Sequence, residues 1–142
     1  MFKNIVLGGT FNKLHEGHEL LIRTAFEVAK DDGKIYIGLT SDEFANKFRT
    51  DKVINYEERK KNLENFIEKI GIKKNYEILK IDDVYGIATI KECLDTIVVS
   101  EETLARAEEI NAIRFKKKLS RLIIIVVPLV LKENKPISSS DL

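Results

Sequence analysis

The chain has 142 residues, 44% of them hydrophobic and 33% charged, and its formal net charge is +1. This length suits one domain with a sizeable core, and the near-neutral charge provides no overall field to attract nucleic acid or an acidic membrane surface. The only cysteine, Cys93, excludes an internal disulfide, and the longest apolar run, 122–131, is about half of the roughly 20 residues that cross a bilayer, so we expect a soluble, cytoplasmic protein without a nucleic-acid or membrane partner.

Short apolar runs alternate along the chain with longer helical patterns. The β-branched run at 3–7 ends at a Gly-Gly pair and predicts a buried strand. A helical stripe of apolar residues covers 16–30 and ends at Asp-Asp-Gly. The remaining predicted elements are a strand at 34–40, a short helix at 41–48, a helix at 56–70, a strand at 76–81, a short helix at 86–94, a strand at 96–100, a helix at 101–118 and a strand at 121–131.

Strands that alternate with helices favour parallel pairing through right-handed crossovers. The sequence therefore predicts an α/β fold, a doubly wound five-stranded parallel sheet with helices on both faces. No repeat or composition break divides the chain, so we expect a single domain over 1–142, with 132–142 as a polar C-terminal tail. We also expect 121–131 to be a central or adjacent buried strand, and Cys93 to be a small buried apolar side chain.

Ligands of such sheets bind at the carboxyl ends of the strands, where the strand order reverses. The sequence GGTF leaves the first predicted strand and SEE leaves the fourth. If the order reverses between these two strands, both loops face one crevice.

The stretch GGTFNKLHEGH after the first strand contains both histidines of the chain. Gly8 and Gly9 allow a phosphate to approach the backbone, and Thr10 adds a hydroxyl donor. His15 and His18 are three residues apart at the start of the next helix, so both side chains point the same way. The amino end of a helix favours anions. This arrangement suits attack on a nucleotide α-phosphate, where donors stabilise charge on the equatorial oxygens.

Other interpretations of the stretch find less support. It lacks the GxxxxGK[ST] spacing of a Walker-type loop and the GxGxxG spacing of a dinucleotide site. Two histidines would need a third ligand, such as Cys93 or a carboxylate, to hold a metal ion, and we expect no metal bound by the protein itself. A glycine turn followed by two surface histidines is the plain alternative.

The whole stretch resembles the GGTFDxLHxGH signature of the HxGH nucleotidyltransferase superfamily, which includes the cytidylyltransferases and the phosphopantetheine adenylyltransferases. Asn12 stands where that signature commonly has Asp. The resemblance implies direct in-line transfer of a nucleotidyl group from a nucleoside triphosphate, without a covalent intermediate. It also implies Mg²⁺, bound mainly through the phosphates of ATP.

Later segments extend the resemblance in colinear blocks over nearly the whole chain. TSDEFANKF is similar to the family segment whose lysine binds phosphate, which places Lys47, although a solvated helix lysine would look the same. NYEERKKNL places Arg59 as a substrate-binding candidate, with an arginine ion-paired on a charged helix as the alternative. VVSEETLARAEEIN resembles the archaeal phosphopantetheine adenylyltransferases, and PISSS resembles their ISST segment, which meets the triphosphate.

The resemblance implies an adenylyltransferase that converts ATP and 4′-phosphopantetheine to dephospho-coenzyme A and pyrophosphate. Thr10 would orient the attacking phosphate, and Lys47 would bridge it to the α-phosphate. His18 would bind the α-phosphate in the transition state, and His15 would hold the outer phosphates. The other implied nucleotide contacts are Gly8, Gly9, Phe11, Ser100, Glu101, Ser138 and Ser139.

The last residues depart from the family pattern. The family continues ISST with an arginine and a basic arm, whereas this sequence reads ISSSDL, with Asp141 where a cation would meet phosphate. We therefore expect one triphosphate contact to be missing. Two alternatives stay open, a cytidylyltransferase acting on a phosphorylated alcohol and a nucleotide-binding module that has lost turnover.

Overall fold

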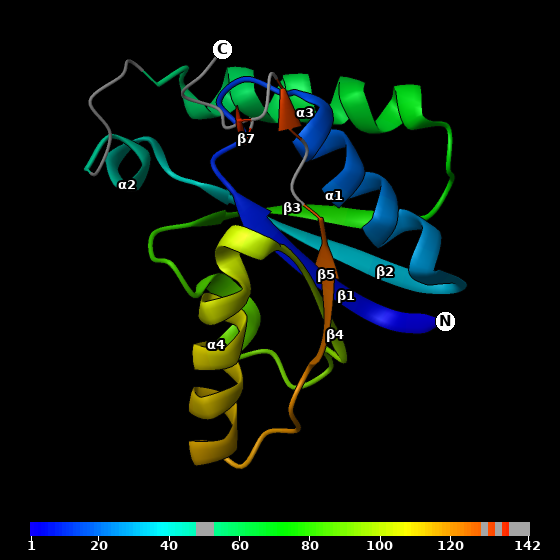
Figure 1. Cartoon of the computed structure of the whole chain (residues 1–142), viewed down its shortest axis with the longest axis vertical. Coiled ribbons are helices and arrows are strands. Elements are labelled where there is room, and N and C mark those ends of the chain that lie inside the picture. Colours follow the sequence, from blue (N-terminus) through cyan, green and yellow to red (C-terminus); the bar gives the residue numbers. More distant parts are fainter. Residues whose placement is uncertain (48–52, 129–130, 133–134, 137–142) are drawn as a thin grey trace.

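The computed structural model describes residues 1–47, 53–128, 131–132 and 135–136. Five parallel strands form one sheet, in the order β3 (Asn75–Ile81), β2 (Ala29–Thr40), β1 (Phe2–Gly9), β4 (Thr96–Ser100) and β5 (Ile123–Val127). Four α-helices, two 3₁₀ turns and a small antiparallel pair complete the described elements (Figure 1). They are α1 (Glu16–Val28), α2 (Asp42–Lys47), α3 (Tyr56–Ile70), η1 (Gly86–Thr89), η2 (Glu101–Thr103), α4 (Leu104–Lys116), β6 (Leu131–Lys132) and β7 (Lys135–Pro136).

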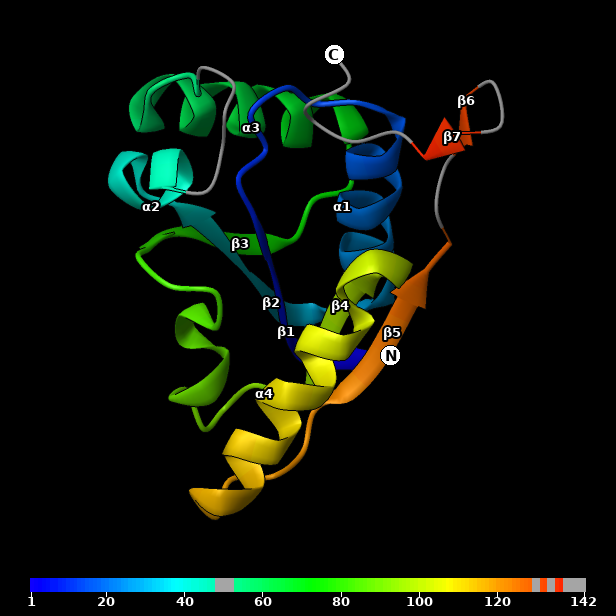
Figure 2. The same cartoon turned by 60° about the vertical axis from the view of Figure 1, so that its left-hand side comes forward.

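Helices cover both faces of the sheet, as the sequence predicts for a doubly wound fold. Helices α1 and α3 lie on one side, and α4 with η1 lies on the other (Figures 1 and 2). Strand β1 divides its side chains between two cores, because successive side chains of a strand point to opposite faces. Ile5 and Leu7 join the core under α1 and α3, whereas Val6 joins the core under α4.

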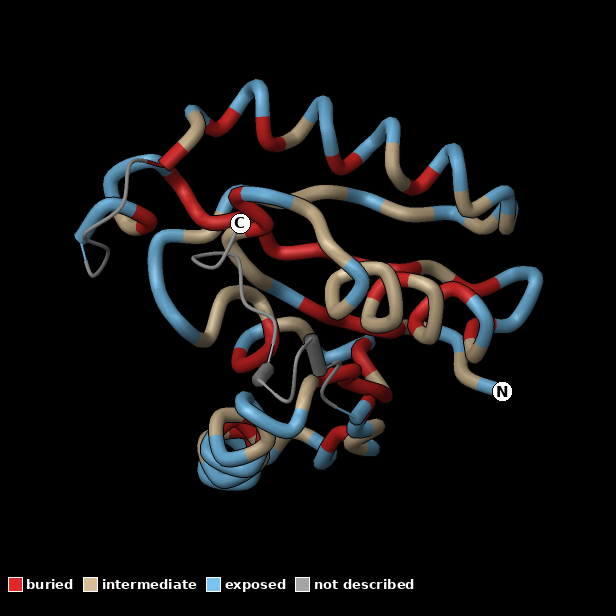
Figure 3. Tube along the Cα trace, turned by 45° about the horizontal axis from the view of Figure 1, so that its top comes forward, coloured by how far each residue is buried: buried red, intermediate tan, exposed pale blue. Residues whose placement is uncertain are grey.

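Helix α3 has the predicted bounds because both of its ends are capped. The Asn55 side chain accepts a 2.9 Å hydrogen bond from the Glu58 amide at the amino end. Gly71 adopts φ +76° at the carboxyl end, a left-handed conformation that glycine reaches without strain. Leu63 and Ile67 are buried, and the outward-facing side of the helix is exposed (Figure 3).

Strand β2 begins earlier than predicted. Helix α1 ends at Val28, and the strand runs on through Asp31, Asp32 and Gly33. The Asp-Asp-Gly sequence indicated a helix stop, but Gly33 serves a close approach to β1. A Cβ atom at Gly33 would lie 2.7 Å from the Lys3 carbonyl oxygen.

The expectations for the strand at 121–131 and for Cys93 were wrong. Strand β5 covers only Ile123–Val127 and pairs with β4 alone among the described strands, which leaves Ile123 51% exposed. Cys93 is exposed in the turn before β4, where its neighbour Leu94 takes the buried position. Two helices are also shorter than predicted, since 86–94 forms only η1 and 101–118 divides into η2 and α4.

The helices of the described part of the chain are all too short or too polar to cross a membrane.

Candidate active site

The strand order reverses between β1 and β4, where the sequence places the crevice. The register pairs Val6 with Ile97, and the pairing stops there although both strands continue. A cavity of about 350 Å³ opens between the separating strands. Its lining includes Gly8 and Gly9 of β1, Val99 of β4, and residues of β2, of the loop after β3 and of α4.

The two histidines lie together at the amino end of α1. His15 is the N-cap residue, and its Nδ1 accepts a 3.0 Å hydrogen bond from the Gly17 amide. A neutral His15 ring therefore carries its proton on Nε2. The His18 ring stacks on that of His15, with centroids 3.9 Å apart, and Phe11 packs edge-on against His18 at 5.1 Å. The pair lies at a helix end that favours anions, with His15 Nε2 and His18 Nδ1 both buried.

Close packing around the histidines explains two features of the motif. A Cβ atom at Gly17 would lie 2.9 Å from His15 Cε1, so only glycine leaves room for the capping ring. Phe11 is 3% exposed at φ +47°, and a Cβ atom at Gly9 would lie 3.2 Å from its ring. Phe11 therefore packs closely against Gly9 and His18.

Thr10 follows β1 and contacts the end of the neighbouring strand. The register pairs Gly8 with Gly38 and Gly9 with Leu39, so Thr10 lies beside Thr40. The Thr40 hydroxyl donates a 3.1 Å hydrogen bond to Thr10 Oγ1. Thr40 was missed by sequence reasoning, although two strands that end in Gly-x-Thr at neighbouring sheet positions were a usable signal.

Arg59 lies beneath the site and not at its surface. Its side chain is fully buried and forms a 3.0 Å ion pair with Asp42. The guanidinium also donates to the carbonyl oxygens of Ile54 and Thr10 and to Thr40 Oγ1. The expectation of direct substrate contact is therefore corrected, because burial leaves no guanidinium surface for a ligand. The ion-paired alternative describes its position better.

Asn12 explains why the Asp of the signature can be replaced here. Its Oδ1 accepts a 2.8 Å hydrogen bond from the Ile54 amide, and the residue is 5% exposed. An amide oxygen fills this acceptor position as a carboxylate oxygen would.

The other expected site residues lie in three places. Lys47 is exposed at the carboxyl end of α2. Ser100 ends β4, where its side chain and that of Thr103 cap η2, and Glu101 is exposed on that turn. Ser138, Ser139 and Asp141 lie outside the described residues.

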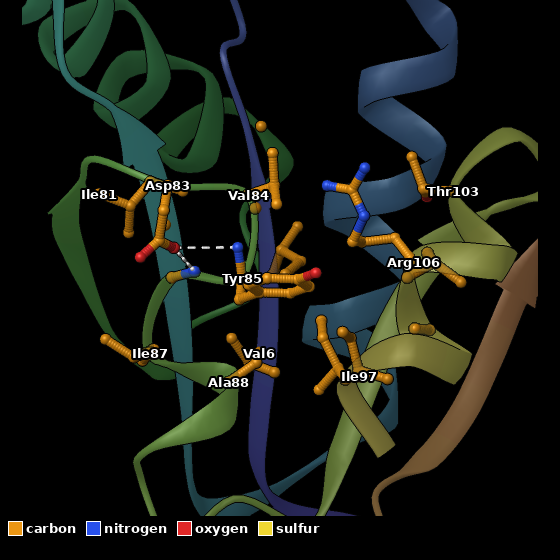
Figure 4. A pocket seen from close by; sticks show the side chains of 18 of the residues that line it. Val6, Ile81, Asp83, Val84, Tyr85, Ile87, Ala88, Ile97, Thr103 and Arg106 are labelled. Carbon is orange, nitrogen blue, oxygen red and sulfur yellow. Dashed lines mark hydrogen bonds between the residues drawn. The ribbon is translucent and has the colours of Figure 1, made fainter. Parts of the chain in front are cut away.

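One wall of the cavity is formed by the loop after β3, which no sequence motif indicated. Asp83 Oδ1 accepts hydrogen bonds from the amides of Tyr85 and Gly86, as Figure 4 shows. The Tyr85 hydroxyl donates to Glu109 Oε2 of α4 at 2.9 Å, and this bond raises the pKa of Tyr85. The Arg106 guanidinium lies 5.8 Å from the Tyr85 ring centroid.

A second buried arginine supports this wall from behind. Arg114 of α4 is fully buried, and burial lowers its pKa. All four of its hydrogen bonds go to backbone carbonyl oxygens, including those of Ala88 at 2.8 Å and Lys91 at 2.9 Å. It therefore joins the end of α4 to η1 and to the segment that follows it.

The described residues contain no group of three or more histidine, cysteine or acidic side chains that could hold a metal ion.

Comparisons with known proteins agree with this geometry. Residues 6–142 match the family described as cytidylyltransferase-like. The phosphopantetheine adenylyltransferase of Thermococcus kodakarensis is 45% identical over 130 residues, which cover 91% of this chain and 76% of the relative. That of Methanosarcina acetivorans is 46% identical over 138 residues, covering 96% and 86%. A solved Archaeoglobus fulgidus protein of unknown function is 30% identical, with a TM-score of 0.77, and the match covers 95% of this chain and 99% of that one.

Proposed function

We propose that this chain, which belongs to the cytidylyltransferase-like family of nucleotidyltransferases, transfers the adenylyl group of ATP to 4′-phosphopantetheine. The products are dephospho-coenzyme A and pyrophosphate, so the reaction is a step of coenzyme A biosynthesis. The observation that carries the proposal is the stacked His15–His18 pair at the amino end of α1, beside Thr10 and the cavity. The curated relatives at 45% and 46% identity support the choice of substrates.

The reaction needs little covalent help from the protein. A phosphate oxygen of 4′-phosphopantetheine attacks the α-phosphorus of ATP and forms a new P–O bond, while the bond to the bridging oxygen breaks and pyrophosphate leaves. The attacking oxygen is already anionic, so a strong general base is not required. Catalysis then rests on positioning and on stabilising charge at the α-phosphate.

Each side chain of the site has a role in this scheme. Thr10 orients the acceptor phosphate, and Lys47 bridges that phosphate to the α-phosphate. His18 donates to the α-phosphate as charge develops, and His15 holds the outer phosphates through its Nε2 proton. Ser100 and Glu101 contact the ribose or adenine, beside the backbone of Gly8 and Gly9, and Ser138 and Ser139 contact the triphosphate.

Mg²⁺ enters this scheme as part of the substrate MgATP. In this scheme the phosphate oxygens of ATP are its main ligands. The ion neutralises charge on the outer phosphates.

The shape of the cavity favours an acceptor with a long organic arm. With its phosphate on Thr10, the rest of the acceptor reaches the cavity, whose wall carries apolar side chains such as Val84, Ile87 and Ile97. A small phosphorylated alcohol would leave this space empty. This observation favours phosphopantetheine over the cytidylyltransferase alternative.

Pyrophosphate release tests the proposal. The assay contains ATP and Mg²⁺, with and without 4′-phosphopantetheine, and a parallel arm contains CTP and glycerol 3-phosphate. We expect release only when ATP and phosphopantetheine are both present, and a His18→Ala variant should lose about 100- to 1,000-fold in kcat while still binding ATP. Release only with CTP would favour the cytidylyltransferase. ATP binding without any release would favour the binding module.

A further inference from the structure

We propose that Thr40 is a positioning residue that fixes the direction in which the Thr10 hydroxyl donates its proton. Arg59, Thr40 and Thr10 form a directed series of hydrogen bonds, here called the hydroxyl chain, which ends at the acceptor phosphate. This inference rests on the proposed function, because it assigns the last donor of the chain to the phosphate of phosphopantetheine.

The hydroxyl chain is assembled from three elements. Arg59 Nη1 of α3 donates to Thr40 Oγ1 at 3.2 Å, and Thr40 at the end of β2 donates to Thr10 Oγ1 at 3.1 Å. The same Nη1 donates to the carbonyl oxygen of Thr10 at 3.0 Å. Thr40 is 5% exposed and Arg59 is fully buried, so water does not compete for these bonds.

Counting protons gives the hydroxyl chain its direction. A hydroxyl carries one proton, and Thr40, whose oxygen accepts from Arg59 Nη1, donates that proton to Thr10 Oγ1. Thr10 therefore accepts within the chain, and its proton points away from Thr40. Because β1 and β2 are neighbours in the sheet and Thr40 also lines the cavity, the remaining direction leads to the site.

Arg59, the first donor of the hydroxyl chain, is fixed in place. Arg59 Nε donates to the Ile54 carbonyl oxygen at 2.6 Å, and Nη2 pairs with Asp42 at 3.0 Å. The guanidinium is therefore held with Nη1 facing Thr40. A hydrogen bond that begins on a cation polarises those that follow, which makes Thr10 a stronger donor as well as a directed one.

Removal of the Thr40 hydroxyl separates this role from simple packing. Thr40→Val keeps the shape of the side chain and deletes the middle donor. We expect kcat with phosphopantetheine to fall about fivefold to tenfold, with the KM for ATP unchanged, and Thr40→Ser to restore most of the rate. Thr96→Val is the matched control, because Thr96 is a fully buried threonine of β4 whose hydroxyl donates to Asp95.

A double-mutant cycle with Thr10→Val gives the decisive result. If Thr40 acts through the Thr10 hydroxyl, Thr40→Val has no further effect on kcat once that hydroxyl is gone. If the two losses multiply in the double variant, or if Thr40→Val behaves like Thr96→Val, the inference is overturned.

A measurement without turnover keeps this inference distinct from the proposed function. Nuclear magnetic resonance of threonine-labelled protein should show a slowly exchanging Thr40 hydroxyl proton near the Thr10 methyl group. We expect the signal to be lost in Thr10→Val and retained in Thr96→Val. If wild-type protein releases no pyrophosphate but shows this signal, the proposed function fails and the hydroxyl chain stands. If the wild-type signal is absent, the hydroxyl chain is refuted whatever the activity.

Discussion

The Tyr85 hydroxyl donates a 2.9 Å hydrogen bond to Glu109 Oε2, and this bond ties the loop after β3 to helix α4 beside the cavity. Asp83 holds the same loop through the amides of Tyr85 and Gly86 (Figure 4). The wall of the cavity is therefore positioned by side-chain contacts between segments that are distant in sequence.

Replacement of Tyr85 by phenylalanine should loosen this wall without disturbing the nucleotide site. Because one partly exposed hydrogen bond to a charged acceptor is lost, we expect the KM for phosphopantetheine to rise about threefold to tenfold. The KM for ATP should rise less, because the histidine pair lies at the amino end of α1, whereas Tyr85 lies in the loop after β3. Steady-state kinetics with each substrate varied in turn measures the difference. Tyr76→Phe on β3 is the control, and an equal rise in both KM values for Tyr85→Phe would contradict the assignment.

His15 caps helix α1 and is proposed to bind phosphate, and two substitutions separate these two roles. His15→Ala removes both the N-cap acceptor and the imidazole, so we expect the free energy of unfolding to fall by about 1 kcal/mol and ATP turnover to fall strongly. His15→Asn restores a favoured cap and should recover the stability but not the turnover. Urea unfolding and pyrophosphate release measure the two effects. Full recovery of turnover in His15→Asn would mean that the ring only caps the helix.

The order of elements and the position of the crevice could be predicted from the sequence because both follow from local patterns. β-Branched runs and the Gly-Gly pair mark strand ends, and Asn55 and Gly71 mark the ends of α3. The start of β2 and the edge position of β5 could not be predicted, because they depend on which strands meet in the sheet. Ile123 has the same apolar character whether or not a neighbour covers it.

One part of the candidate site could be predicted from the sequence, and another part could not. The motif at 8–18 is contiguous, so its side chains could be placed before the fold was known. Thr40, Tyr85 and Arg114 come from separate segments and gain their roles only through contacts across the sheet. Arg59 was noticed in the sequence, but its burial, which decides its role, follows from how α3 packs.

Gly17 should be required for activity rather than for stability. A Cβ atom there would lie 2.9 Å from His15 Cε1, so Gly17→Ala displaces the ring, while alanine in the first helical turn favours α1 by about 0.5 to 1 kcal/mol. We expect turnover to fall to the level of the His15 variants, with little net change in thermal stability, because the helix preference of alanine offsets the cap bond that the displaced ring loses. Combining Gly17→Ala with His15→Asn should cause no further loss of turnover. A variant with normal kcat would show that the ring keeps its position by another route.

Arg114 should contribute both to the stability of the fold and to binding of the acceptor. Its guanidinium is fully buried and satisfies the backbone carbonyl oxygens of Ala88, Lys91, Leu94 and Ser120. Because a buried polar group left without its hydrogen bond costs about 1 to 3 kcal/mol, we expect Arg114→Met to lower the free energy of unfolding by about 2 to 4 kcal/mol. Urea unfolding measures this loss, and Arg23→Ala, which removes a half-exposed ion pair with Glu19, should change it by less than about 0.5 kcal/mol.

The kinetic effect of the Arg114 change distinguishes support of the cavity wall from a general loss of folded protein. Ala88 lines the cavity and accepts from Arg114, so Arg114→Met should raise the KM for phosphopantetheine at a temperature where the variant is fully folded. The KM for ATP should change less, because the histidine pair lies at the amino end of α1, on the opposite face of the sheet from α4. A lower kcat with both KM values unchanged would instead indicate that only the amount of active enzyme had fallen. In that case Arg114 would stabilise the fold without positioning the acceptor.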